Sequence, residues 1–211
     1  MFLKIKRLSN SRFLIKRLMM KFIISQVKGV EFDVAIDLGA GRAPYRKFIR
    51  CRKYIAIDKG SSNNLENFIQ ADLGQGIPLE DNFADLVLAT ELLEHIKKPE
   101  FLLREVNRIL KQGGRLILTT PFVWPLHEEP NDFWRFTKYG LGNLLKESGF
   151  VNIKIEPSNN FSVTILQLAN TGLASRIFKP LWFIFNIKGI ILQKFGRNYS
   201  LPVCYFVSAC K

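Results

Sequence analysis

The chain is expected to fold as one α/β unit built on a parallel sheet. Short apolar segments alternate with segments of helical spacing from Asp33 onward, a glycine-rich turn follows the first apolar segment, and acidic residues stand at the ends of the next ones. This alternation is typical of parallel strands whose crossover helices cover both faces of the sheet. With 211 residues, 47% of them hydrophobic, the chain has the size of one domain and is too apolar to be disordered.

Apolar runs rich in β-branched residues predict the strands, and helical spacing predicts the helices. The strands are expected over residues 33–38, 53–57, 67–70, 85–89, 115–120, 151–156 and 202–210. The helices are expected over residues 43–50, 99–110 and 137–148, with Thr137 as an N-cap. Gly113 and Gly114 are expected to end the second of these helices, because glycine adopts the left-handed conformation common at helix ends.

Residues 1–30 are predicted to form a basic amphipathic arm in front of a domain over residues 31–211. The arm holds eight Lys or Arg residues and no acid. Read as a helix, it places Leu14, Leu18 and Phe22 on one side and Arg17 and Lys21 on the opposite side. Basic residues interrupt every apolar run, so we do not expect a cleaved leader.

Residues 157–200 are predicted to form an apolar helical insertion before the last strand. Residues 161–195 are rich in Ile, Leu and Phe, and no acid occurs after residue 156. The densest apolar run, residues 181–187, is far shorter than the roughly 20 residues that span a bilayer, so we expect no transmembrane segment.

The net charge of +13 resides in the two ends of the chain, because residues 31–156 are nearly neutral. Basic ends suggest an anionic partner, either nucleic acid or a membrane surface. Their long aliphatic side chains favour a membrane surface over nucleic acid. Alternatively, both apolar ends cover the sheet or a dimer interface. The three cysteines lack metal-like spacing, so we expect a reducing compartment, no disulfide framework and no metal site.

The segment VAIDLGAG, residues 34–41, is the first candidate binding motif. A turn containing Gly39 and Gly41 after a first parallel strand lets a ligand approach the backbone closely. Asp58 ends the second strand about 20 residues later, where a carboxylate can accept both hydroxyls of a ribose. Asp72 follows the third strand and could face the amine of an adenine. Alternatively, the glycines only shape the turn.

The order of DLGAG, AID, ADL, FADLVLATELLEH and LREVNRILKQGGRLILTTP resembles the class I S-adenosylmethionine-dependent methyltransferases over residues 33–156. This resemblance implies a Rossmann-like sheet of seven mostly parallel strands in the order 3-2-1-4-5-7-6, flanked by helices, with the last strand antiparallel. It also implies S-adenosylmethionine as the cofactor. A nicotinamide-dependent dehydrogenase is unlike this pattern, because Pro44 stands where the third glycine of its motif is required.

The resemblance also implies which residues bind the cofactor. The methionine end would lie against Asp37, Gly39, Ala40 and Gly41, the ribose against Asp58, the adenine against Asp72 and Leu73, and the transferring methyl group beside Thr90 and Glu91. His95 resembles a position beside the cofactor, where a structural role is the favoured interpretation.

The proline-rich loop over residues 121–137 gathers polar and aromatic side chains at the edge of the sheet where catalytic groups collect. Methyl transfer depends mainly on alignment, but an acceptor hydroxyl must also lose its proton. His127 is the candidate base, with Asp132 orienting it or acting as the base itself. Trp134 and Arg135 are candidates for binding the acceptor, with Arg135 suited to an anionic group. Alternatively, His127 and Arg135 only attach the loop to the domain.

The acceptor is expected to be a hydroxyl group of a sugar or lipid-linked glycan at the cytoplasmic face of the membrane. The loop resembles methyltransferases of surface-polysaccharide and lipid-linked glycan biosynthesis. Residues 89–94, ATELLE, lack both the (Asp/Asn)-Pro-Pro-aromatic run of amino-methylating nucleic-acid enzymes and the Pro-Cys pair of base methylation. An RNA methyltransferase and a non-catalytic, cofactor-binding scaffold stay open as alternatives. The sequence does not distinguish an oxygen acceptor from a nitrogen acceptor, and it predicts no oligomeric state.

Overall fold

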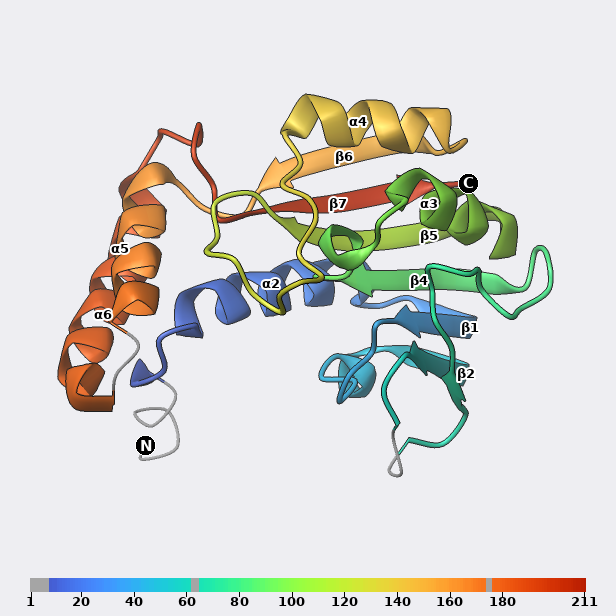
Figure 1. Cartoon of the computed structure of the whole chain (residues 1–211), viewed down its shortest axis with the longest axis horizontal. Helices are drawn as coiled ribbons and strands as arrows, with labels where there is room; N and C mark the ends of the chain where they lie inside the picture. The colour runs from blue at the N-terminus through green and yellow to red at the C-terminus, as the bar shows by residue number, and fades with distance from the viewer. Residues whose placement is uncertain (1–7, 62–64, 174–175) are drawn as a thin grey trace.

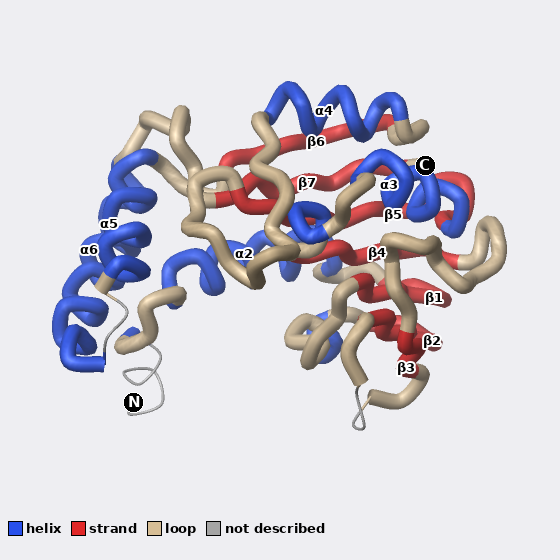
Figure 2. The backbone as a smooth tube through the Cα atoms, in the orientation of Figure 1, coloured by secondary structure: helices blue, strands red, loops and turns tan. Residues whose placement is uncertain are grey.

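The computed structural model describes residues 8–61, 65–173 and 176–211 and contains one seven-stranded sheet (Figures 1 and 2). The strand order β3-β2-β1-β4-β5-β7-β6 is the one that the resemblance implied. Every pairing is parallel except the two made by β7, which is antiparallel to β5 and β6. The strands are β1 (Glu31–Leu38), β2 (Arg50–Asp58), β3 (Phe68–Gln70), β4 (Ala84–Thr90), β5 (Leu110–Pro121), β6 (Val151–Pro157) and β7 (Cys204–Cys210).

Helices cover both faces of the sheet and one end. Helices α3 (Pro99–Ile109) and α4 (Lys138–Glu147) pack on one face, and α2 (Phe13–Val27) packs on the other. Helices α5 (Phe161–Gly172) and α6 (Lys179–Phe195) pack on each other beyond the edge at which β1, β4 and β5 end (Figure 1). Thr137 caps α4 as predicted, because its side-chain oxygen accepts a hydrogen bond from the Gly140 amide at 3.1 Å.

Two local predictions from the sequence are wrong. The helix expected over residues 43–50 is only a 3-10 turn, η1 (Arg46–Phe48), because Pro44 disfavours helical backbone at Ala43, whose φ is +46°. Gly113 and Gly114 do not end α3, which already stops at Ile109. They lie instead in β5, where the register against β4 shifts and Gly113 has a φ of +75°.

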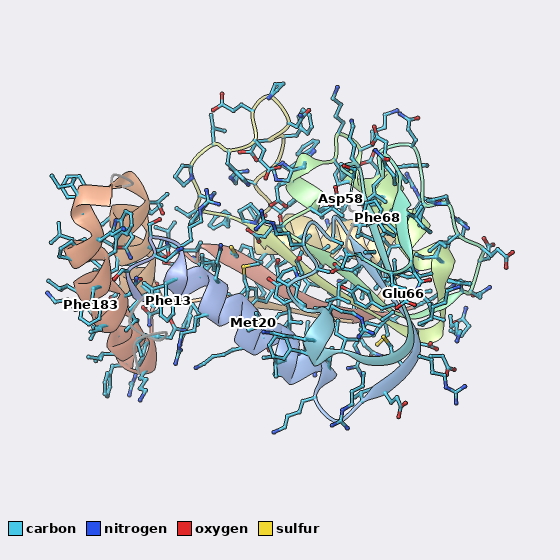
Figure 3. The ribbon with its side chains drawn as sticks, turned by 90° about the horizontal axis from the view of Figure 1, so that it is seen from below. Phe13, Met20, Asp58, Glu66, Phe68 and Phe183 are labelled. Atoms are coloured by element: carbon cyan, nitrogen blue, oxygen red, sulfur yellow. The ribbon has the colours of Figure 1, made fainter. Side chains whose placement is uncertain are left out.

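The predicted amphipathic helix near the N-terminus is present as α2, and its apolar side is part of the core. Figure 3 shows α2 lying against the sheet with α5 and α6 at its first residues. Its buried side chains include Ile15, Met19 and Ile23, and Phe22 stacks on Phe206 of β7 with ring centroids 4.8 Å apart. This apolar side is therefore covered by the sheet. The first seven residues of the predicted arm lie outside the described residues.

Replacing Ile23 with alanine tests whether α2 belongs to the folded domain. The side chain is fully buried, so we expect the free energy of unfolding to fall by about 2–5 kcal/mol in a denaturant titration. Lys21→Ala, an exposed neighbour on α2, is the control and should change stability by less than about 0.5 kcal/mol. Equal stability of the two variants would show that α2 is not part of the core.

Helices α5 and α6 form the predicted apolar insertion, and they bury several polar side chains while exposing many apolar ones. Polar side chains point inward: Asn170 donates to Asn186 at 3.0 Å, and Gln167 donates to the Ser11 carbonyl at 2.7 Å. All three side chains are buried. Exposed apolar side chains lie outside, on Phe161, Ile165, Leu181, Ile184, Ile187, Ile191, Leu192 and Phe195. None of the helices in the described part of the chain combines the length and apolar character needed to cross a bilayer.

Candidate active site

The turn after β1 is shaped for close approach of a ligand. Gly39 and Gly41 have φ values of +64° and +52°, which favour glycine. A Cβ atom at Gly39 would also lie 3.0 Å from a methyl group of Leu92. The amides of Gly39 and Ala40 donate to the Ile57 carbonyl at 2.8 and 3.3 Å. The turn therefore offers a ligand a bare backbone surface, while its amides hold the turn against β2.

Asp58 lies at the end of β2, where the sequence predicted the ribose site. Its Oδ2 accepts a hydrogen bond from the Gly41 amide at 2.9 Å, and its Oδ1 accepts one from the Gly60 amide at 2.8 Å. Each carboxylate oxygen can accept a second hydrogen bond. The two oxygens are thus fixed in place with remaining capacity for a pair of hydroxyl groups.

Asp37, at the end of β1, is buried with one carboxylate oxygen unpartnered. Its Oδ2 accepts a hydrogen bond from the Tyr54 hydroxyl, whereas Oδ1 has no partner among the described residues. Burial, with a smaller contribution from the charge of Asp58, raises the pKa of Asp37 to about 7 despite the Tyr54 bond. An ammonium group next to Oδ1 would satisfy this atom, so the site fits the amino end of a bound methionine moiety.

Asp72 and Leu73 follow β3 in the position predicted for the adenine. Asp72 is exposed and accepts hydrogen bonds from the Gly74 amide at 3.0 Å and from Lys59 Nζ at 3.2 Å. The Gly74 bond is the main reason that its pKa lies below the usual value. The side chain of Leu73 packs in the core, so only its backbone faces this position.

Thr90 ends β4, the strand next to β1 in the sheet, and Glu91 follows it. Glu91 has a φ of +51°, and its amide donates to the Thr119 carbonyl at 2.9 Å. The Thr119 hydroxyl donates to Glu91 Oε1 at 3.1 Å. Burial raises the pKa of the Glu91 carboxyl. The fold thus brings the predicted methyl-transfer position to the centre of the carboxyl edge.

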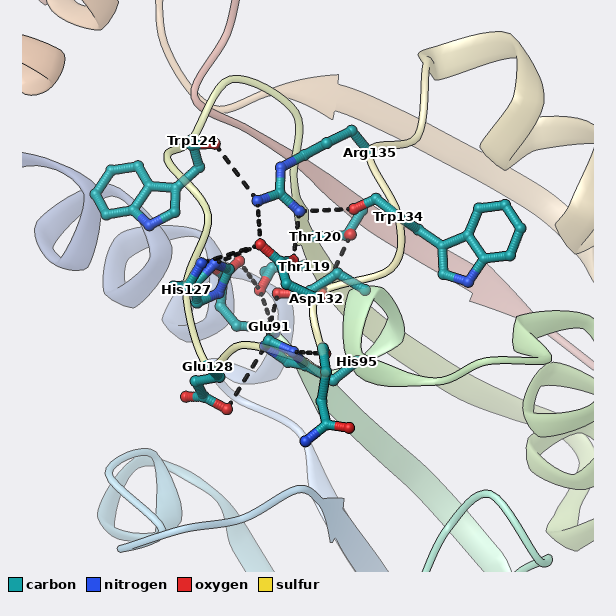
Figure 4. Close-up of polar contacts among 12 residues, drawn as sticks. Glu91, His95, Thr119, Thr120, Trp124, His127, Glu128, Asp132, Trp134 and Arg135 are labelled. Carbon is teal, nitrogen blue, oxygen red and sulfur yellow. Dashed lines mark hydrogen bonds and ion pairs between the residues drawn. The ribbon is translucent and has the colours of Figure 1, made fainter.

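The loop over residues 121–137 lies across this edge and is held together by Arg135 and Asp132 (Figure 4). The two terminal nitrogens of Arg135 each donate to one Asp132 oxygen at 2.6 Å, and they also donate to three loop carbonyls. This pair holds the pKa of Asp132 well below its usual range. Such a carboxylate is a poor proton acceptor, so its geometry suits positioning rather than the alternative role of base.

His127 lies directly beside Asp132. The His127 amide donates to Asp132 Oδ2 at 3.1 Å, and its ring nitrogen Nδ1 lies 3.2 Å from the same oxygen outside hydrogen-bond geometry. The ring is mostly buried and packs edge-on against His95, with centroids 4.9 Å apart. Trp134 of the same loop donates from Nε1 to the Ile96 carbonyl at 2.9 Å, and 41% of the residue is exposed.

Glu94 and His95 also lie beside the end of β4, although the sequence analysis did not single out Glu94. Both lie in the 3-10 turn η2 (Leu93–His95) after β4. Glu94 is fully buried, and its Oε2 accepts a hydrogen bond from the Thr120 hydroxyl at 3.4 Å. Burial and the neighbouring Glu91 raise the pKa of Glu94 well above its usual value. The three-residue spacing of the two glutamates in TELLEH was the available signal.

The comparisons with known proteins agree with this geometry. Residues 36–118 match the family model described as "Methyltransferase domain". An uncharacterised protein of Methanocaldococcus jannaschii is 30% identical over 133 residues, 56% of this chain and 65% of that protein. The ubiquinone/menaquinone biosynthesis C-methyltransferase UbiE of a Shewanella species is 37% identical over 71 residues, 34% of this chain and 27% of that enzyme. The chain thus spans less than two thirds of these relatives.

Solved structures share the fold. An S-adenosylmethionine-dependent methyltransferase from Archaeoglobus fulgidus superposes with a TM-score of 0.62 at 18% identity, covering 96% of this chain and 95% of that one. Phosphoethanolamine N-methyltransferase 2 of Haemonchus contortus, in complex with S-adenosyl-L-methionine, gives a TM-score of 0.62 at 18% identity. The superposition covers 91% of this chain and 52% of that enzyme.

Residues 36–118 thus match a methyltransferase domain, and the chain has the fold of the class I S-adenosylmethionine-dependent methyltransferases. The residues around the β1 turn fit that cofactor, since Asp37 has an unpartnered buried oxygen and Asp58 has free acceptor capacity. The family match ends at residue 118, before the loop over residues 121–137 and before α5 and α6.

Proposed function

We propose that the protein transfers the methyl group of S-adenosylmethionine to a hydroxyl group of a sugar or lipid-linked glycan, at the inner surface of the cytoplasmic membrane. The observation that carries this proposal is the meeting of His127, Asp132 and Arg135 with the end of β4. These side chains lie on the face that an acceptor must approach to reach the methyl group.

The reaction requires that the acceptor oxygen be aligned with the methyl group and its sulfur, and that one proton leave the acceptor. When bound, S-adenosylmethionine supplies a methyl group on a positively charged sulfur, which needs no activation beyond alignment with the acceptor. His127 takes the proton from the acceptor hydroxyl at a ring nitrogen. Asp132 and Arg135 hold the loop so that the ring stays at the end of β4. Trp134 offers an exposed ring to the face of a sugar. Arg135 has few donors left for an acceptor.

The membrane part of the proposal rests on α5 and α6. Their outward side carries eight exposed apolar side chains, their inward side buries several polar ones, and residues 157–211 contain basic residues but no acid. A groove between α2 and α6 is lined by the basic residues Arg17, Lys21 and Lys194 and by apolar residues that include Leu14 and Leu18. Apolar side chains beside basic ones are what an anionic lipid surface binds. These helices stand at the same end of the molecule as the site (Figure 1).

Two isoleucines on the outer side of α6 test the membrane contact. Ile184 and Ile191 lie two turns apart and are about half exposed. Fully burying an apolar side chain of this size contributes about 1.5–3 kcal/mol, and about half of each side chain is already buried, so the double change Ile184→Ser and Ile191→Ser should weaken binding to anionic vesicles by at least about 10-fold. Sedimentation with phosphatidylglycerol vesicles measures this. Tyr139→Ser, an exposed aromatic on α4, is the matched control.

The outcome distinguishes the lipid surface from RNA. Binding to vesicles that contain phosphatidylglycerol, but not to neutral vesicles, supports the proposal. Equal vesicle binding by the double variant and the control would contradict it. Tight binding to RNA at the same salt concentration would favour the RNA methyltransferase.

The reaction itself is tested with labelled S-adenosylmethionine and a membrane extract that contains lipid-linked glycans. Label should enter a glycan fraction, and mass spectrometry should place the added methyl group on oxygen. Methylation on carbon, as the name of the UbiE relative would suggest, would refute the hydroxyl acceptor. Cofactor binding without any transfer would favour the non-catalytic scaffold.

A further inference from the structure

The fold brings both histidines of the chain into one cluster with carboxylates (Figure 4). Potential ligand atoms of Glu94, His95 and His127 all lie within 4.8 Å of one another. His95 Nε2 is 3.8 Å from Glu94 Oε1 and 3.8 Å from Glu128 Oε2. His127 comes from a loop more than thirty residues further along the chain, so the convergence is a product of the tertiary fold.

The orientation of the His95 ring is fixed by its other nitrogen. Nδ1 lies 2.7 Å from the Asn131 carbonyl oxygen, which can only accept a hydrogen bond, so Nδ1 carries the hydrogen. In the neutral ring Nε2 then presents a lone pair toward the Glu94 and Glu128 oxygens. A histidine that donates one nitrogen to a carbonyl and aims the other at carboxylates has the arrangement typical of a metal ligand.

Glu94 supplies an independent observation. The side chain is fully buried, and Oε1 has no hydrogen-bond donor among the described residues. This oxygen points into the cluster, at the 3.8 Å distance from His95 Nε2. An unpartnered carboxylate oxygen in the interior costs free energy unless a cation lies next to it.

The carboxyl groups at the cluster also lack a cationic side chain as a partner. Asp132 lies beside it, but Arg135 donates from its two terminal nitrogens to Asp132 and to loop carbonyls. Among the described residues, no Lys or Arg side chain donates a hydrogen bond to Glu94 or Glu128, which both lie 3.8 Å from His95 Nε2.

We propose that Glu94, His95 and His127 bind a divalent first-row transition-metal ion, with Glu128 as a fourth ligand. Two imidazoles with carboxylates suit Zn²⁺, Mn²⁺ or Fe²⁺, whereas Mg²⁺ and Ca²⁺ prefer oxygen ligands throughout. Ligands at about 2.1 Å from a tetrahedral ion lie about 3.4 Å apart, so binding requires the cluster to contract by roughly 1 Å. Glu128 is exposed and can follow this movement.

The catalytic consequence rests on the proposed function. An ion at this position, beside the end of β4, would hold the acceptor oxygen next to the methyl-transfer position and make its proton easier to remove. His127 would then act as a ligand of the ion rather than as the base. Because loss of His127 impairs the reaction in either role, the site has to be tested by metal binding itself.

The experiment uses the full chain without a histidine tag, in the absence of cofactor and acceptor. After equilibrium dialysis against Zn²⁺ or Mn²⁺, elemental analysis should find about one ion per chain, with Mg²⁺ bound at least about 10-fold more weakly. His95→Ala and Glu94→Gln should each lower the affinity for Zn²⁺ by at least about 100-fold. The matched control Glu100→Gln, on α3, and a Cys51→Ser, Cys210→Ser double variant should bind as the wild type does.

A second readout avoids substitutions in the interior. Zinc titrated into the wild type should shift the ring NMR signals of both histidines together, at one equivalent. Signals that do not move, or zinc affinity that is unchanged in folded Glu94→Gln protein, would overturn the metal site. Since neither measurement involves methyl transfer, failure of the metal site leaves the proposed reaction standing, and failure of the reaction leaves the metal readout unaffected.

Discussion

Asp58→Ala is expected to weaken the binding of S-adenosylmethionine by about 10- to 150-fold. A hydrogen bond to a charged acceptor contributes about 1.5–3 kcal/mol, and a tenfold change in affinity corresponds to about 1.4 kcal/mol. Loss of this carboxylate would also release the Gly41 and Gly60 amides, which its oxygens hold at 2.9 and 2.8 Å. The effect therefore combines a lost ribose contact with a loosened turn. Calorimetric titration with S-adenosylmethionine measures the sum.

Two further variants separate these contributions. Asp58→Asn keeps one acceptor oxygen but presents an NH₂ group to one of the two amides, so its affinity should fall between those of the wild type and the alanine variant. Asp33→Ala, which removes an exposed carboxylate of β1 that pairs with Arg52, should leave the affinity unchanged. Unchanged affinity of Asp58→Ala, with the fold retained by circular dichroism, would move the ribose site elsewhere.

The central sheet could be predicted from the sequence because its strands are short runs of buried β-branched residues bounded by turns. Ile36 pairs with Ile55 on one side and with Val87 on the other, so these apolar runs lie inside the sheet. A parallel sheet that is covered on both faces has strands of this continuous apolar kind. The strand order and the antiparallel β7 came only from the family resemblance. The failed helix over residues 43–50 shows the limit of periodicity, since Pro44 outweighed the apolar spacing around it.

The position of the apolar ends could not be predicted, because an amphipathic pattern reports that one side is covered but not what covers it. In α2 the covering element is the sheet, whereas α6 turns Ile184 and Ile191 outward. The buried amide of Asn186 shows why: it donates to the Leu8 and Asn10 carbonyls at 2.6 and 3.0 Å, which orients α6 with its polar side inward. Contacts this distant in sequence leave no trace in local spacing.

The same reason explains which candidate site residues could be brought together from the sequence. Asp37 and Asp58 lie at the ends of the adjacent strands β1 and β2, and Gly39 and Gly41 lie in the turn after β1, so strand assignment was enough to bring them together. Glu94 was missed because a glutamate is assumed to be exposed. Its burial depends on the loop over residues 121–137 closing over η2, where the Phe133 amide donates to the Glu94 carbonyl at 2.9 Å.

His127→Ala is expected to lower turnover by about 100-fold or more while changing cofactor affinity by less than about twofold. The residue lies in the loop over residues 121–137 and is not among the residues predicted to bind the cofactor, so its ring can act on the acceptor without supporting the cofactor. Steady-state kinetics with labelled S-adenosylmethionine gives turnover, and calorimetry gives affinity. Glu129→Ala, an exposed residue two positions away in the same loop, is the matched control and should retain full turnover.

Turnover also separates the two roles that His127 can have. If the ring takes the proton directly, a chelator should leave the wild type active, and His95→Ala should cost far less than His127→Ala. If the ring holds a cation, the chelator and both histidine variants should reduce turnover to a similar level, and added Mn²⁺ or Zn²⁺ should restore only the chelated wild type. Turnover that survives His127→Ala would instead mean that alignment of the acceptor beside Thr90 and Glu91 is sufficient, as a reactive sulfonium methyl group allows.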